Sequence, residues 1–143
     1  MKTINISTDF SDCPGPRYHN QGDFTGEDFY HQLLNEKFME CVRDDDDLTV
    51  NLDDTNGYMS SFLDEAFGNL VYDFGPDEVT KRLKIVSNEE PVWIDLIFKK
   101  IIPDWTKNLN NKIAPKKTLK KNHTPWYRKI NGELKQGVWV KSV

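Results

Sequence analysis

The sequence predicts an α/β protein with a mostly parallel sheet of about four strands, helices packed against that sheet, and a C-terminal β-hairpin. Two observations support this prediction. Short runs of alternating apolar residues are followed by longer runs with helical spacing. Such alternation implies right-handed crossovers onto one sheet. Near the C-terminus, Asn131-Gly132 separates two short runs and is a strong hairpin signal.

The first strand is predicted over residues 3–8, with Ile4 and Ile6 facing the core. A polar loop broken by proline and glycine follows. The first long helix is predicted over residues 25–43, where Thr25 is a suitable N-terminal cap and the acids after it suit the positive end of a helix.

The centre of the chain is the stretch 48–75, in which the apolar period changes from that of a strand to that of a helix. Residues 48–52 alternate as a strand and residues 53–57 are typical of a turn. A helix follows, with Ser61 and Asp64 placed as in a capping box and Gly75 as its stop.

The remaining elements follow the same alternation. Residues 76–81 are interpreted as a short connector with room for one helical turn, and residues 83–86 as the next strand. The last helix is predicted to start within residues 87–91 and to end at Pro103, because proline disrupts a helix interior.

Charge divides the chain into two unlike parts. Residues 1–100 hold 9 basic and 21 acidic residues, a net charge of −12, and residues 101–143 hold 10 basic and 2 acidic residues, a net charge of +8. We therefore expect a domain over residues 1–104 and a basic extension with a hairpin over residues 105–143. The asymmetry indicates either an intramolecular charge match or an anionic partner for the tail.

The stretch 48–75 resembles the serine loop of STAS domains, which occur in anti-sigma factor antagonists and at the ends of sulphate transporters. There, a strand leads through a loop reading roughly Asp-Ser-Ser-Gly into an apolar helix, and a partner kinase phosphorylates a loop serine. The string SFLDEAFG at residues 61–68 is closer still to a bacterial STAS-like family of unknown function, as are residues 15–17 and 26–29. The resemblance covers residues 3–102. Met59 and Phe62 depart from the phosphorylatable pattern, where Asp and Gly stand.

The resemblance implies a non-enzymatic regulatory module that docks a protein partner through the serine loop and the following helix. The implied partner is a histidine-kinase-like ATPase, released when Ser60 or Ser61 is phosphorylated. A phosphate there would meet outward-pointing helix amides but also nearby carboxylates that repel it. The alternative is that Ser61 only caps the helix and Ser60 only fills the turn. The residues expected to contact the partner are Arg17, Asp53, Asp54, Phe62, Asp64 and Glu65.

The basic tail supports a competing hypothesis, in which the protein binds nucleic acid. Lysines would neutralise phosphates and aromatic rings would stack on bases. A third interpretation is that the tail folds back on the acidic domain as extra strands. The residues that nucleic-acid binding would use are Lys116, Lys117, Lys120, Lys121, Trp126, Tyr127, Arg128 and Lys129.

The sequence also indicates which classes do not apply. No apolar run approaches the ~20 residues that span a bilayer, and the N-terminus lacks the apolar core of a signal peptide, so we expect a cytoplasmic protein without a membrane partner. The histidines and cysteines lack the spacing of a metal site. The chain has neither a P-loop nor a dinucleotide-binding glycine pattern, so we expect no cofactor and no catalysis.

Overall fold

The computed structural model describes residues 1–119 and 124–139. A parallel sheet runs in the order β1 (Lys2–Asn5), β2 (Leu48–Asn51) and β3 (Leu83–Val86). The predicted α/β class and parallel pairing are confirmed. In the described residues this sheet has three strands, so the expectation of about four is wrong. The two C-terminal strands pair only with each other and form a separate sheet.

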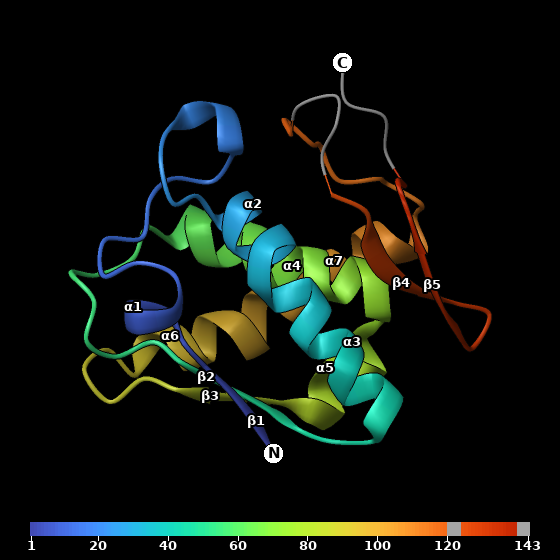
Figure 1. Cartoon of the computed structure of the whole chain (residues 1–143), viewed down its shortest axis with the longest axis horizontal. Helices are drawn as coiled ribbons and strands as arrows, with labels where there is room; N and C mark the ends of the chain where they lie inside the picture. Colours follow the sequence, from blue (N-terminus) through green and yellow to red (C-terminus); the bar gives the residue numbers. More distant parts are fainter. Residues whose placement is uncertain (120–123, 140–143) are drawn as a thin grey trace.

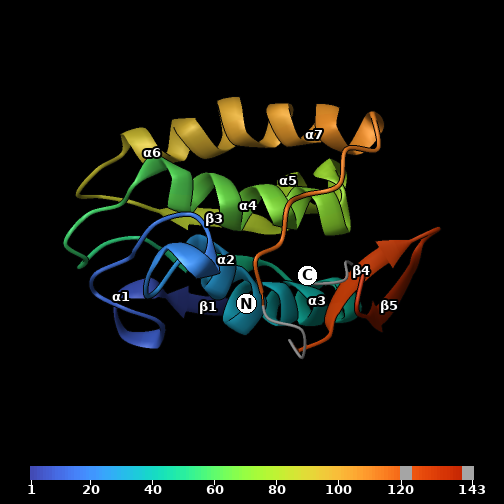
Figure 2. The ribbon, with the colours of Figure 1, turned by 90° about the horizontal axis from the view of Figure 1, so that it is seen from above.

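The parallel sheet is covered on one face. Alternate residues of the strands, such as Ile4, Val50 and Leu83, are buried. On the opposite face Thr3, Thr49 and Lys84 lie in register and are exposed or half-buried. Figure 1 shows the strands below the main helices, and Figure 2 shows those helices as three neighbouring rows.

The helical row nearest β1 is one continuous helix. It consists of α2 (Gly26–Phe29), a π-helical stretch η2 (Tyr30–Leu34) and α3 (Asn35–Asp44), which confirms the helix predicted over residues 25–43. The side chain of Thr25 caps it, since its oxygen accepts from the backbone N–H of Asp28 at 3.0 Å.

The chain before this helix differs from the prediction. The first strand ends at Asn5, and residues 6–9 form a helical turn, α1 (Ile6–Asp9), so the strand predicted over residues 3–8 is too long. The carboxylate of Asp9 accepts from the backbone N–H of Asn5 at 2.8 Å and stabilises this turn. A short 3-10 turn, η1 (His19–Gln21), lies in the following loop.

The central row is α4 (Ser60–Phe74), which ends at Gly75 as predicted. Ser60 is its first residue and Met59 occupies the cap position, where no side-chain cap bond forms. The predicted capping box at Ser61 and Asp64 is therefore wrong. The connector predicted over residues 76–81 is a helix, α5 (Pro76–Arg82), because its first residue is a proline that suits a helix start.

The third row joins α6 (Val92–Asp95), a π-helical stretch η3 (Leu96–Ile101) and α7 (Ile102–Asn110). The predicted end at Pro103 is wrong, since the helix continues to Asn110. Pro103 lies in the first turn after the π-helical stretch, where a missing N–H is tolerated. The boundary expected between residues 104 and 105 lies inside α7.

The C-terminal hairpin is confirmed. Strands β4 (Trp126–Ile130) and β5 (Glu133–Gly137) pair antiparallel around Asn131 and Gly132. Both turn residues have positive φ, 52° and 80°, as a two-residue hairpin turn of type I′ requires.

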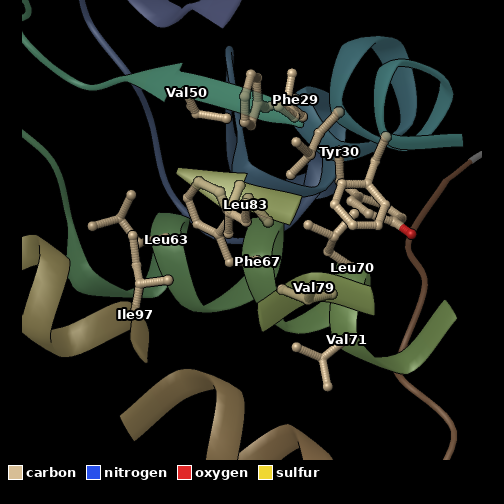
Figure 3. Close-up of a cluster of buried hydrophobic side chains, with 14 of the residues drawn as sticks. Phe29, Tyr30, Val50, Leu63, Phe67, Leu70, Val71, Val79, Leu83 and Ile97 are labelled. Carbon is tan, nitrogen blue, oxygen red and sulfur yellow. The ribbon is translucent and has the colours of Figure 1, made fainter. Parts of the chain in front are cut away.

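The core lies between the sheet and the helices, and α4 contributes the largest share of it. Figure 3 shows Phe67, Leu70 and Leu63 from α4 facing Val50 and Leu83 from the sheet. Tyr30 belongs to the same cluster, but its hydroxyl oxygen points out of it, toward the tail. At the edge of the core this hydroxyl donates to Asp73 of α4 and accepts from Asn35 of α3.

Helix α7 lies close to α4 because of Gly68. A Cβ atom at this position would overlap the indole ring of Trp105, which is 8% exposed. We expect Gly68→Ala to lower the free energy of unfolding by about 1–3 kcal/mol, since overpacking exceeds the gain in helix propensity.

Urea unfolding measures this change. Gly137→Ala is the matched control, because its new Cβ atom would lie 3.6 Å from the nearest ring atom of Trp139, an ordinary contact. A Gly68→Ala variant as stable as the wild type would mean that the close approach of the two helices is not required.

Candidate functional site

A surface hollow of about 280 Å³ lies at the N-terminal end of α4. We call it the serine hollow. The loop before α2 contributes one of its walls, the first turn of α4 contributes the floor and both serines, and the third helical row contributes the other wall. Its lining residues are Arg17, Ser60, Ser61, Asp64, Leu96, Lys100, Ile101 and Asp104.

The loop that carries Arg17 is fixed to the start of α2 and α4. The backbone N–H groups of Gly26 and Glu27 donate to the carbonyls of Pro16 and Arg17, at 2.9 and 3.0 Å. Gly26 in turn contacts the backbone of Phe62 so closely that a Cβ atom would overlap the Phe62 carbonyl. The absence of a side chain at Gly26 thus brings Arg17 beside the first turn of α4.

Charges in the serine hollow are paired. Arg17 Nη1 lies 2.6 Å from Asp64 and 3.4 Å from Glu65, and Lys100 Nζ lies 3.0 Å from Asp104. Asp64 also accepts from the indole N–H of Trp105 at 3.0 Å. Each cation at the rim therefore has a carboxylate partner that a docking group would have to displace.

Glu65 lies behind Asp64, in the interior. It is 1% exposed, and its second carboxylate oxygen accepts from the side chain of Asn69 at 2.7 Å. Burial raises the pKa of Glu65, while Lys117, Asn69 and Arg17 act in the opposite direction. Glu65 therefore holds Arg17 from the inside and is not itself available to a partner.

The structure brings together two of the expected partner contacts, Arg17 and Asp64, and the two phosphorylation candidates, Ser60 and Ser61. Phe62 is fully buried and stacks on Phe29, with ring centroids 5.8 Å apart, so its role is in the core.

Asp53 and Asp54 lie outside the serine hollow, in the turn after β2. The carboxylate of Asp53 accepts from the backbone N–H groups of Asn88 and Glu89, at 3.1 and 3.0 Å. The backbone N–H of Asp54 donates to the Glu89 carboxylate at 2.7 Å. Asp53 and Asp54 thus join the turn after β2 to the loop after β3.

The tail lies against α2 and α4. After α7 it crosses α4 toward α2, as Figure 2 shows. Lys117 donates to Asn69 Oδ1 at 2.6 Å, and Thr118 donates to Glu27 through its hydroxyl at 2.6 Å and its backbone N–H at 2.9 Å. Burial lowers the pKa of Lys117, although Asp73, Glu65 and Glu27 act in the opposite direction.

The hairpin contacts α3, α4 and α5. Trp126 is 2% exposed, Arg128 forms an ion pair with Asp73 at 3.1 Å, and Lys129 pairs with Glu78 at 3.0 Å. The side chain of Asn35 accepts from the backbone N–H of Tyr127 and donates to its carbonyl, at 2.8 and 2.9 Å.

The residues predicted for nucleic-acid binding are therefore engaged within the chain to different degrees. Lys117, Trp126, Arg128 and Lys129 contact the helices, and Tyr127 is half-buried. Lys116 is exposed, with its ammonium 4.9 Å from the centre of the Tyr18 ring. Lys120 and Lys121 lie outside the described residues.

Glu65 was predicted as a partner contact, but the other polar residues of this network were missed from the sequence. Glu65, Asn69 and Asp73 stand at intervals of four on an otherwise apolar helix, which is a recognisable polar stripe. Glu27 and Asn35 carry no comparable signal, because their partners lie about ninety residues away in the chain.

Within residues 1–119 and 124–139, no three or more His, Cys, Asp or Glu residues are grouped so that they could hold a metal ion. In the part of the chain that the structure describes, no helix combines the length and apolar character that crossing a bilayer requires.

The fold and the serine hollow define a small α/β module in which a strand leads into a helix that begins with two serines. Residues 25–93 match the family described as the STAS-like domain of unknown function (DUF4325). The match begins after the loop that carries Arg17. Neither the comparison with curated proteins nor the comparison with solved structures found a match.

Asp73 gives the first prediction from this site. Burial raises its pKa from the ordinary value of 3.8 to about 6, while Lys117, Tyr30 and Arg128 act in the opposite direction. The folded state therefore holds the proton to higher pH than the unfolded state, and the contribution of Asp73 to stability falls as the pH rises from 3.8 to 6.

Urea unfolding of the wild type and Asp73→Asn across this range isolates the effect, because the other titrating groups are common to both proteins. The stability of the wild type relative to the variant should decrease with rising pH and become constant above 6. A constant difference across the range would contradict the raised pKa.

A second prediction concerns the attachment of the hairpin. Asn35→Ala removes both side-chain bonds to Tyr127 and leaves polar groups unpaired at a site that is 1% exposed. We expect a loss of about 1–3 kcal/mol in the free energy of unfolding. Gln32→Ala, an exposed position of the same helix, is the control and should change little. Equal stability of the two variants would show that Asn35 does not hold the hairpin.

Proposed function

We propose that this protein is a non-enzymatic regulatory module that docks a protein partner at the serine hollow. The observation that carries the proposal is the convergence there of two expected partner contacts, Arg17 and Asp64, with both phosphorylation candidates, Ser60 and Ser61, at the start of α4. The match of residues 25–93 to the STAS-like family supports it. By the resemblance to anti-sigma factor antagonists, the partner is a histidine-kinase-like ATPase and the setting is the cytoplasm.

The chemistry of the serine hollow suits a protein surface. Leu96 and Ile101 contribute apolar side chains, and Met59, which is 53% exposed, precedes Ser60 at the start of the same helix. Methionine and arginine are enriched at protein interfaces. The charges at the rim are already paired, so a partner gains affinity mainly by covering apolar surface and by exchanging one ion pair for another.

Phosphorylation of either serine would change the charge at the rim of the serine hollow. Ser60 is exposed and Ser61 is half-buried, so Ser60 is the more accessible hydroxyl. A phosphate adds nearly two negative charges. Asp53 and Asp54 were expected to repel this phosphate, but they lie outside the hollow, against the loop after β3. Arg17 and Lys100, in contrast, line the same hollow as the serines. The phosphate would compete with Asp64 and Asp104 for these cations and so alter the surface that the partner meets.

The contacts of the tail weigh against nucleic-acid binding as the main function. Lys117, Arg128 and Lys129 would each have to leave a carboxylate or amide partner before binding a phosphate. Trp126 would have to leave the core before stacking on a base. The interpretation in which the tail completes the acidic domain accounts for these contacts without a ligand.

The test is binding of serine variants to a partner isolated from the native host. Ser60→Asp and Ser61→Asp should weaken binding, while Ser60→Ala and Ser61→Ala should retain it, because alanine keeps the surface uncharged. Since neither serine caps α4, both alanine variants should unfold within a few tenths of a kcal/mol of the wild type.

Intact mass after incubation with the partner and ATP shows whether either serine is modified. An unmodified mass, together with Asp variants that bind as tightly as the wild type, would leave a docking module without a phosphoswitch. Binding that survives Arg17→Ala and Leu96→Ala unchanged would place the partner elsewhere.

A further inference from the structure

A line of contacts joins the tail to the serine hollow through the interior of α4. Lys117 Nζ donates to Asn69 Oδ1 at 2.6 Å, and Asn69 Nδ2 donates to Glu65 Oε2 at 2.7 Å. The other oxygen of Glu65 lies 3.4 Å from Arg17 Nη1. Asn69 is fully buried and Glu65 is 1% exposed, so solvent screens these contacts little.

The amide of Asn69 is held in one orientation by its two neighbours. An ammonium group only donates hydrogen bonds and a carboxylate only accepts them, so the amide oxygen faces Lys117 and the amide nitrogen faces Glu65. The same nitrogen also donates to the backbone carbonyl of Glu65 at 2.7 Å. Departure of Lys117 would therefore remove the partner that orients the amide.

Glu65 is shared between the tail and the loop. Lys117 and Arg17 both lower its pKa against the effect of burial, so both contribute to balancing its charge. Lys117 also interacts with Asp73 and Glu27, and its ammonium lies 3.0 Å from His31 Nε2, while Arg128 opposes its charge.

Arg17 is likewise shared, between two carboxylates. Its Nη1 atom lies 2.6 Å from Asp64 at the rim and 3.4 Å from Glu65 in the interior. The shorter contact is the one at the rim. With the tail in place, Arg17 is thus held at the surface of the serine hollow.

We propose that the tail regulates the serine hollow by setting where Arg17 is held. The seated Lys117 balances Glu65 and leaves Arg17 paired with Asp64 at the rim. When the tail leaves, Arg17 is the one of these two cations that still balances the charge of Glu65. The guanidinium of Arg17 then moves inward, away from the docking surface. The regulatory meaning rests on the proposed function, whereas the coupling between Lys117 and Arg17 does not.

The coupling is measured in the full chain without a partner. The protein has four arginines, so the side-chain signals of Arg17 can be resolved by NMR. Lys117→Met removes the charge and keeps most of the side-chain volume. We expect the guanidinium signals of Arg17 to shift and its exchange with solvent to slow severalfold, because a side chain that is 27% exposed moves inward.

Lys129→Met is the matched control. It removes one tail charge as well, but Lys129 pairs with Glu78 and not with the line of contacts to Glu65. Arg17 should keep its wild-type signals in this variant. Unchanged Arg17 signals in a folded Lys117→Met protein would overturn the proposal, as would an equal change in both variants.

If Lys117→Met does not fold, the coupling is tested in the opposite direction, by removing the side chain of Arg17 and observing the tail. Coupling is reciprocal, so removing Arg17 must affect the tail. In Arg17→Ala, Glu65 depends more on Lys117, and the tail should be held more firmly. Hydrogen exchange of the Thr118 backbone N–H, which donates to Glu27 at 2.9 Å, should slow. Arg43→Ala, an exposed arginine paired with Asp44, is the control.

The coupling would also be overturned if the backbone N–H of Thr118 exchanged equally fast in the wild type and in a folded Arg17→Ala protein. Partner binding separates this result from the docking proposal. If the coupling is observed but a partner binds the wild type and Lys117→Met equally, the regulation fails and docking stands. If Arg17→Ala leaves partner binding unchanged while the coupling is observed, docking at the hollow and its regulation fail, and the coupling between Lys117 and Arg17 stands.

Discussion

Helix α4 brings charge into the interior, and the rest of the structure depends on how that charge is balanced. Glu65 and Asp73 are nearly inaccessible to solvent, although both belong to the helix that contributes the largest share of the core. A buried carboxylate is costly unless cations and donors surround it. The cations come from residues distant in the chain, namely Arg17 before the helix and Lys117 and Arg128 after it. The tail is therefore part of the domain's electrostatics, and the opposite net charges of the two parts of the chain have a structural reason.

The same balance explains why the two ends of α4 differ. At its N-terminal end the carboxylates lie at or just behind the surface, and the serine hollow remains open between two helical rows. Farther along, Asp73 is enclosed by the hydroxyl of Tyr30, the guanidinium of Arg128 and the aromatic rings of the hairpin. One end of the helix thus borders an open hollow, and the other end is covered by the chain itself.

Much of the fold was predictable, because it follows from local patterns. The strand at 48–51, the helix that ends at Gly75 and the Asn131-Gly132 hairpin each depend on neighbouring residues. The errors have physical causes as well. Pro103 was expected to end a helix, but a π-helical stretch before it absorbs the irregularity. Ser61 matched a capping pattern, but the helix begins one residue earlier.

The candidate site was predictable only in part. Arg17, Ser60, Ser61 and Asp64 were identified from short motifs, and the structure brings them together. Contacts across long stretches of chain were not identified, since nothing near Glu27 or Asn35 in the sequence indicates a partner some ninety residues away. The polar stripe formed by Glu65, Asn69 and Asp73 was visible, but its meaning depended on knowing that a lysine from the tail lies against it.

The late position of the balancing cations has a consequence for synthesis of the chain. A ribosome completes α4 long before it reaches Lys117 and Arg128, and domains generally begin to fold from the N-terminal side as they emerge. Until residues 117–128 have emerged, Glu65 and Asp73 face water or bind protons, and the aromatic pocket for Trp126 stands open. The nascent protein thus has an interval in which its central helix is formed but not enclosed. The interior is completed only by residues that are synthesised well after the central helix.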